Sequence, residues 1–344
     1  MDITQLLAES VSHGASDLHL SAGLAPRVRI DGDIRSLDWP ALSATQVADM
    51  LSPLLNKHQQ KDFETSLETD FSFELPDVAR FRVNVFQQHR GMGAVFRAIP
   101  SRVLSLDELQ LGEVFRRIAD LPQGLVLVTG STGSGKSTTL AAMIDYLNSH
   151  RPRHILTLED PIEFVHPSKK ALVSQRQIYR DTHSVCAALR SALREDPDVI
   201  LVGEMRDLET IRLALTAAET GHLVFGTLHT LTAAKTVDRV VDVFPASEKT
   251  MVRSMLSESL QAVVSQTLIK KIGGGRVAAY EIMLGTPAIR NLIRADKVAQ
   301  MYSAIQTGGA FGMKTLDMSL KALVNQGLIS REDARERARA PGEM

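Results

Sequence analysis

The sequence predicts an α/β protein built from two domains. In the first hundred residues, apolar and polar positions alternate in several short runs, which is typical of an antiparallel sheet. From Gly124 onward, short apolar runs alternate with longer helical patterns, which is typical of a parallel sheet. The chain has 344 residues, of which 44% are hydrophobic, and this length exceeds what one hydrophobic core usually serves. Two domains are therefore expected.

Residues 1–99 are expected to form a small α/β domain. Charged and apolar residues alternate on both sides of Asp31-Gly32, a pair that suits a tight hairpin turn. Ser43 is a candidate N-cap for a helix that Pro53 ends or kinks. The other expected elements are a helix over 3–11 and strands at 17–20, 71–73, 81–85 and 95–99. Together they predict an antiparallel sheet with helices on one face.

A linker is expected at 100–121, where the pattern becomes irregular and then helical, and the second domain at 122–344. Short apolar runs in this second domain have the length of buried strands, and helical patterns separate them. The runs are 125–129, 155–158, 199–202 and 223–227. Beyond Pro287 the pattern is helical only.

The composition excludes several classes of protein. A formal net charge of -1 lacks the basic excess of a protein held to nucleic acid by charge alone. Cys186 is the single cysteine, so neither an internal disulfide nor a cysteine zinc cluster can form. The N-terminus does not resemble a signal peptide, and no apolar run approaches the roughly 20 residues of a membrane-spanning helix. We expect a cytoplasmic protein with no transmembrane segment.

A phosphate-binding loop is predicted at 130–137. Gly130-Ser-Thr-Gly-Ser-Gly-Lys-Ser137 matches G-x-x-x-x-G-K-[ST] between an apolar strand pattern and a helical pattern, a context that a chance glycine-rich turn would lack. Its glycines let backbone N–H groups surround phosphate oxygens at a helix N-terminus. The expected nucleotide-binding residues are Ser131, Thr132, Gly133, Ser134, Gly135, Lys136, Ser137 and Thr138. No N-K-x-D guanine reader follows, which favours ATP with Mg²⁺ on the Ser137 hydroxyl.

Two further strand ends carry acids that suit phosphoryl transfer to water. Glu204 follows the apolar run 199–202, at the strand edge where ligands of open α/β sheets bind. Gly203 replaces the aspartate usual at that point, so contact of Glu204 with the metal through water is plausible. The segment 159–163 holds three acids beside Pro161, which can aim Glu163 at the γ phosphate. A merely solvated acidic turn is the alternative.

The last strand pattern is flanked by His222 and His229. A lone histidine at a strand end is more often a packing or hydrogen-bonding residue than a catalyst. Because this strand should end near the phosphates, His229 together with Thr227 can sense the γ phosphate. No further ligands accompany the histidines, so zinc is not expected.

These four segments, in this order, resemble the four sequence boxes of the type II and type IV pilus secretion ATPases. The resemblance covers nearly the whole chain and implies a PAS-like N-terminal domain, a RecA-like motor domain and a homohexamer. Within that superfamily, Ala288–Arg294 matches the motif of the type IV pilus retraction ATPases, the PilT type. Taken alone, the pattern of this segment is that of an ordinary amphipathic helix. The absence of a tetracysteine module also favours retraction over extension.

The resemblance implies roles for particular residues. Glu163 becomes the general base, Glu204 the magnesium-linked acid and His222 the residue that names the histidine box. Arg82 and Arg97 match arginines that the family's N-terminal domain supplies to the phosphates of a neighbouring site. From the pattern alone, both are also consistent with solvated strand arginines.

The function implied by the resemblance is a motor that retracts type IV pili through an inner-membrane platform protein, working at the inner face of the membrane. The alternatives are a pilus extension or type II secretion ATPase, and a RecA-like nucleic-acid translocase. The basic and aromatic channel residues of a translocase are represented only by Lys270-Lys271 near Arg276, so no nucleic acid is expected. A nucleotide-gated switch without turnover is a further alternative, and Glu163 and Glu204 argue against it.

Overall fold

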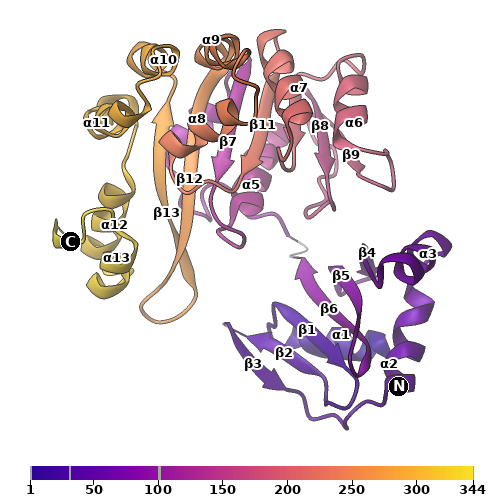
Figure 1. The fold of residues 1–344 in the computed structure, drawn as a ribbon. Helices are drawn as coiled ribbons and strands as arrows, with labels where there is room; N and C mark the ends of the chain where they lie inside the picture. Colours follow the sequence, from indigo (N-terminus) through magenta and orange to yellow (C-terminus); the bar gives the residue numbers. More distant parts are fainter. Residues whose placement is uncertain (1, 31, 100–101, 344) are drawn as a thin grey trace. The chain divides into compact units, whose positions relative to one another are not determined.

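The computed structural model describes residues 2–30, 32–99 and 102–343, and the chain divides into two compact units, Met1–Arg102 and Val103–Met344 (Figure 1). Asp31 of the predicted hairpin turn lies outside the described residues, as do residues 100–101 at the start of the predicted linker. Each unit has its own sheet and its own core.

The first unit is a six-stranded sheet in the order β3-β2-β1-β6-β5-β4 with every pair antiparallel, as predicted. Its strands are β1 (Asp17–Ser21), β2 (Arg27–Ile30), β3 (Asp33–Ser36), β4 (Glu68–Leu75), β5 (Ala79–Gln88) and β6 (Gly91–Ile99). Its helices are α1 (Ile3–Ser12), α2 (Ala44–Leu51), the 3-10 turn η1 (Ser52–Leu54) and α3 (Lys57–Ser66). Ser43 caps α2 as expected, and its hydroxyl accepts from the Gln46 amide. The helix α3 was not predicted.

The two faces of this sheet differ sharply in chemistry. Leu18, Val28, Phe81 and Phe96 belong to one buried cluster with residues of α1 and α2. Since side chains alternate along a strand, the neighbouring arginines of β2, β5 and β6 project from the opposite face. The first unit therefore has one apolar, helix-covered face and one polar face.

The second unit is a seven-stranded sheet in the order β13-β12-β7-β11-β10-β8-β9. Its strands are β7 (Gly124–Thr129), β8 (His154–Glu159), β9 (Leu172–Gln177), β10 (Val199–Val202), β11 (Leu223–Leu228), β12 (Leu260–Lys270) and β13 (Arg276–Leu284). The four predicted strands are present and parallel. β12 also runs parallel to β7, whereas the edge strand β13 is antiparallel. β9, β12 and β13 were not predicted.

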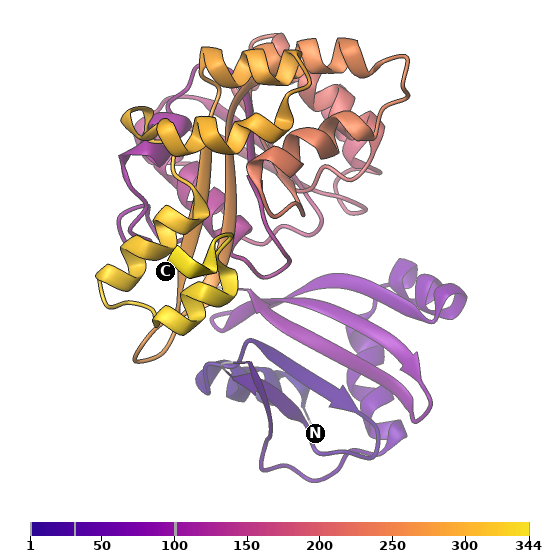
Figure 2. The ribbon, with the colours of Figure 1, turned by 60° about the vertical axis from the view of Figure 1, so that its left-hand side comes forward.

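Helices cover both faces of the second sheet (Figure 2). One face carries α4 (Glu113–Ala119) and α5 (Lys136–His150). The other carries α6 (Val185–Ala192), α7 (Leu208–Glu219), α8 (Ala233–Asp242), α9 (Lys249–Ser259), α10 (Pro287–Arg294) and α11 (Met301–Thr307). The C-terminal α12 (Leu316–Asn325) and α13 (Arg331–Arg337) pack on β12 and β13. The short 3-10 turns are η2 (Val298–Gln300), η3 (Gly309–Phe311) and η4 (Pro341–Glu343).

A linker was predicted at 100–121, but from Val103 onward this segment belongs to the second unit. Leu106, Leu111, Phe115 and Ile118 are buried in the core that α5 shares with the sheet. The apolar face of α4 needs a partner, and the second sheet provides it. Among the described residues, none of the helices has both the length and the apolar character needed to cross a membrane.

Replacing Phe81 with Ala should destabilise the first unit by about 3–5 kcal/mol, because the ring is fully buried and packs edge-on against Phe96. Denaturant unfolding followed by fluorescence of Trp39, the single tryptophan, reports this unit specifically. Phe86→Ala is the matched control on the same strand, where the ring is only half-buried on the polar face. Equal losses in the two variants would contradict the one-sided core.

Candidate nucleotide-binding site

The phosphate loop joins the end of β7 to α5. Gly130, Gly133 and Gly135 have φ angles of 142°, 77° and 88°, which residues with side chains rarely adopt. A Cβ on Gly130 would also lie 2.3 Å from the Gln266 carbonyl oxygen. Gly135 occupies the N-cap of α5 and no side chain caps that helix. The first amides of α5 therefore remain available to an anion.

Lys136 lies within the loop. Its ammonium donates to the carbonyls of Gly130 at 2.9 Å and Ser131 at 3.0 Å, and the residue is only 9% exposed. Burial lowers the pKa of Lys136, and the negative charges of Glu204 and Glu163 oppose that shift. The predicted acids thus act electrostatically on the predicted lysine.

Side chains of the neighbouring strand β12 form hydrogen bonds with the loop and the residues beside it. The sequence did not predict these contacts. The Gln266 side chain donates to the Ser134 carbonyl at 2.7 Å and accepts from the Thr139 hydroxyl at 2.8 Å. Ser265 bonds the Thr129 hydroxyl at 2.8 Å. Gln266 is 5% exposed, so these contacts are shielded from water. The polar run Ser265-Gln-Thr267 directly after the apolar Ala262-Val-Val264 was the available signal.

Glu204 lies at the carboxyl end of β10, where it was predicted. Its carboxylate is bonded by Arg206 at 2.8 Å and by His229 Nε2 at 3.1 Å. Partial burial favours the neutral acid, but the hydrogen bond and charge of Arg206 and the contact with His229 outweigh it, so the pKa of Glu204 is lowered. The group is therefore an ionised carboxylate at neutral pH. Arg206 was not predicted, although it stands two residues after Glu204.

The chain is tightly packed at Gly203. A Cβ there would lie 3.1 Å from the Leu158 carbonyl and 3.3 Å from the Glu159 Cα. The amide of Gly203 donates to Leu158, and its carbonyl accepts from the Thr227 hydroxyl. An aspartate side chain has little room at this point, which accounts for the glycine that the sequence carries.

The acidic segment after β8 is organised by Glu159. Its carboxylate accepts from the Thr157 hydroxyl at 2.7 Å and from the backbone N–H of Glu163, and burial raises its pKa. Gln175 donates both to Glu159 and to the Phe164 carbonyl. Glu159 thus fixes the loop that carries Glu163. It is not a merely solvated acid.

A small cavity of about 40 Å³ adjoins these groups and is lined by Ser137, Glu159, Phe164, His166 and Thr227, among others. Burial lowers the pKa of His166 to about 4, so its ring is neutral. The Nδ1 atom of this ring is buried and has no partner among the described residues. Ser137 therefore shares this cavity with residues at the carboxyl ends of β8, β10 and β11.

The two predicted histidines lie at opposite ends of β11. His229 follows the strand and contacts Glu204, as expected for a residue near the phosphates. His222 precedes the strand, and its Nδ1 lies 3.0 Å from the Ala217 carbonyl. Six residues of extended strand separate the two ends, about 20 Å. The expected catalytic placement of His222 is therefore corrected: within this unit it lies at the edge away from the phosphate loop.

Arg82 and Arg97 face each other across β5 and β6 in the first unit. Arg97 forms an ion pair with the buried Asp17 at 2.9 Å, and Arg82 lies 3.9 Å from Asp70. Both guanidinium groups are more than one third exposed. They share one face of the sheet and remain open to solvent.

The family model of the type II/IV secretion system proteins matches residues 1–335. The chain belongs to this family. It is 74% identical over 341 residues to the type IV pilus retraction ATPase PilT of Pseudomonas aeruginosa, covering 99% of each chain. It is 61% identical over 337 residues to the twitching motility protein of Neisseria gonorrhoeae, covering 98% of this chain and 90% of that one.

The fold agrees with the same family. The crystal structure of the pilus retraction motor PilT with bound ADP superposes with a TM-score of 0.91 at 48% identity, covering 100% of this chain and 99% of that one. The predicted α/β fold class and the predicted secretion-protein family are confirmed.

In this secretion family member, the segment Ala288–Arg294 forms most of α10. Ile289 and Ile293 are buried, as the helical spacing predicts. Arg290 donates to the Ser257 carbonyl and the Gly285 carbonyl, both at 2.7 Å. These bonds fasten α10 to the end of α9 and to the turn after β13.

Gln266→Leu should weaken nucleotide binding about tenfold, because the Ser134 carbonyl and the Thr139 hydroxyl would each lose a buried partner. The measurement is calorimetric titration of ADP. Gln266→Glu keeps the acceptor for Thr139 but sets a buried negative charge against the Ser134 carbonyl and beside the phosphate site, so it should weaken binding at least as much as the Leu variant. Unchanged affinity in the Leu variant would show that β12 does not position the loop.

Proposed function

We propose that this chain is the ATP-hydrolysing motor that retracts type IV pili. The observation that carries the proposal is the convergence of a glycine-rich phosphate loop, Lys136 and two glutamates at one sheet edge. A full-length relative with 74% identity is named a type IV pilus retraction ATPase, which supports the same function and direction of work.

The nucleotide would bind at residues 131–138. Backbone amides of the loop and of the first turn of α5 donate to the phosphate oxygens, and the α5 dipole adds partial positive charge. Lys136 would exchange its two carbonyl acceptors for the β and γ phosphates. The bound ADP of a structural relative supports a nucleotide at this place.

Mg²⁺ is the proposed metal, and the donor set suits it. Among the described residues no cluster of three histidine, cysteine or acidic side chains offers a protein-only metal site. Mg²⁺ does not need one, since it keeps several waters and takes one or two protein oxygens beside phosphates. Ser137 would be the direct ligand and Glu204 a ligand through water. The bound ion would neutralise phosphate charge.

Glu163 is the proposed general base. It stands on a segment that Glu159 and Gln175 hold by hydrogen bonds, so its carboxylate is presented from an ordered loop. Its charge acts on Lys136. A carboxylate so placed accepts a proton from the attacking water, while His229 and Glu204 form the pair that would respond to the γ phosphate.

Arg82 and Arg97 are the proposed link between hydrolysis and motion. Their present partners, Asp70 and Asp17, are carboxylates on the same sheet face. In a homohexamer a phosphate from a neighbouring site would compete with these carboxylates. Arginine stabilises the charge of a transferring phosphoryl group, so the exchange would couple turnover to domain closure.

The proposed setting is a homohexamer at the inner face of the cytoplasmic membrane, driving a pilus platform protein. A nucleic-acid translocase is the weaker candidate, because the net charge of -1 provides no basic excess. Lack of stimulation of ATP turnover by DNA or RNA would separate the two.

Glu163→Gln should reduce kcat about 10²- to 10⁴-fold while leaving ATP binding intact, because it removes the proton acceptor and keeps the side-chain shape. Glu204→Gln should also reduce turnover, and Lys136→Ala should abolish both binding and turnover. Chelation of Mg²⁺ should stop the wild-type enzyme. Glu219→Gln, an exposed acid at the end of α7, is the control. Full turnover in Glu163→Gln would exclude it as the base.

Cells that carry Lys136→Ala should become hyperpiliated and lose twitching motility, because pili would extend without being withdrawn. The assay is electron microscopy of surface pili together with motility under agar. Lys61→Ala, an exposed lysine on α3, should behave as the wild type. Bald cells would reverse the direction of work and make the protein an extension or secretion ATPase.

A further inference from the structure

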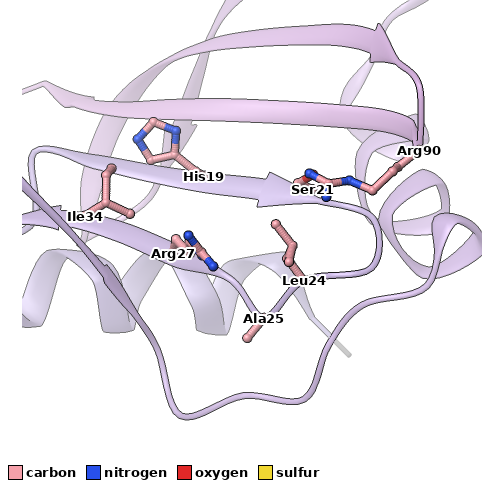
Figure 3. Close-up of a pocket in the computed structure, with 7 residues that line it drawn as sticks. All are labelled: His19, Ser21, Leu24, Ala25, Arg27, Ile34 and Arg90. Atoms are coloured by element: carbon pink, nitrogen blue, oxygen red, sulfur yellow. The ribbon is translucent and has the colours of Figure 1, made fainter.

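A cavity of about 180 Å³ opens in the first unit, well apart in sequence from the phosphate loop (Figure 3). It is lined by His19, Ser21, Leu24, Ala25, Arg27, Ile34 and Arg90. None of these residues is acidic. The cavity is therefore a basic one in a chain whose net charge is -1.

Strand register explains why these side chains meet. His19 pairs with Arg27 across β1 and β2, and Ser21 pairs with Gly93 across β1 and β6. Directly opposed residues of paired strands project from the same face, here the face without helices. Arg90, in the turn between β5 and β6, completes the ring of side chains seen in Figure 3. A Cβ at Gly93 would lie 2.8 Å from Nε2 of Gln88, the atom that donates to the Ser21 hydroxyl.

The arginines of the cavity differ from three others of this face, while Arg29 on β2 donates to the Gly32 carbonyl. Arg80, Arg82 and Arg97 each lie within 4 Å of a carboxylate. Arg27 and Arg90 form no ion pair with any described residue, and Arg90 donates only to the Ser21 hydroxyl at 3.2 Å. Two guanidinium groups without acidic partners at one cavity are suited to an anion.

Two further polar groups of the cavity, on Ser21 and His19, have hydrogen-bonding capacity that no described residue uses. The Ser21 oxygen already accepts from Gln88 at 2.8 Å and from Arg90, which leaves its own proton for another acceptor. The Nε2 atom of His19 is buried and has no partner among the described residues. Burial chiefly lowers the pKa of His19, Asp17 opposes the shift, and Arg29 and Arg97 add to it. A neutral imidazole still offers one N–H donor.

We propose that this cavity is a second anion site, which binds the phosphate group of a small molecule between Arg27, Arg90, His19 and Ser21. A volume of 180 Å³ equals about six waters of liquid, enough for a phosphate and a small organic group. Leu24, Ala25 and Ile34 give the wall an apolar part that an ester would use and free phosphate would not. The site is separate from Arg82 and Arg97, whose guanidinium groups do not line it.

The test is calorimetric titration of the full chain with inorganic phosphate and, separately, with AMP. Both are added to the Lys136→Ala variant, so that the phosphate loop contributes little. Saturable binding is expected, weakened about tenfold by Arg27→Gln or Arg90→Gln. Arg35→Gln, an exposed arginine on β3 outside the cavity, should have no effect. Tighter binding of AMP would assign a phosphate ester, and equal binding would assign free phosphate.

Ile34→Glu provides a second variant, because Ile34 is 43% exposed and its replacement leaves the core intact. The added carboxylate should compete with the ligand and abolish binding, and Trp39 fluorescence verifies folding. Absence of saturable binding to Lys136→Ala, or binding that survives Arg27→Gln and Arg90→Gln, would overturn the proposal. So would a change of oligomeric state in these variants without phosphate binding, which would assign the cavity to a contact between copies.

Discussion

The phosphate loop must present free backbone amides to an anion while buried hydrogen bonds from a neighbouring strand hold its shape. An uncapped α5 and positive φ angles at Gly130, Gly133 and Gly135 expose the amides. The side chain of Gln266 on the neighbouring strand donates to the Ser134 carbonyl and accepts from the Thr139 hydroxyl. The binding loop is therefore a property of β12 as much as of its own sequence.

The charged side chains around the loop stabilise one another's ionised forms. Lys136 is buried and would be expensive to keep ionised without the negative charges of Glu204 and Glu163. Glu204 in turn is held ionised by Arg206 and His229. Burial raises the pKa of Glu159. Its carboxyl group accepts hydrogen bonds from the Thr157 hydroxyl and the Glu163 backbone N–H. Glu159 and Glu204 thus differ in protonation tendency because their surroundings differ: burial dominates at Glu159, and Arg206 and His229 dominate at Glu204.

Sequence reasoning succeeded where structure is local and failed where it is not. The loop, the four parallel strands and the Ser43 cap depend on a few adjacent residues, so their patterns were readable. β12 begins directly after the last residue of α9, with no turn residue between Ser259 and Leu260, and was missed. The role of Gln266 and the position of His222 at the far end of β11 depend on which strands become neighbours. Burial of residues 103–121 likewise depends on the second core, which no local pattern reveals.

The polar face of the first sheet follows from the alternation of side chains along its strands. Alternation along β1, β2, β5 and β6 forces arginines onto one face once Leu18, Val28, Phe81 and Phe96 occupy the core. Arg97 pairs with the buried Asp17, whereas Arg82 lies 3.9 Å from the exposed Asp70, a surface pair worth at most about 1 kcal/mol. A phosphate would displace Asp70 at little energetic loss, which would suit the role proposed for Arg82. Arg27 and Arg90 form no ion pair within the described part of the chain, so an anion at the proposed second site would bind without displacing a carboxylate.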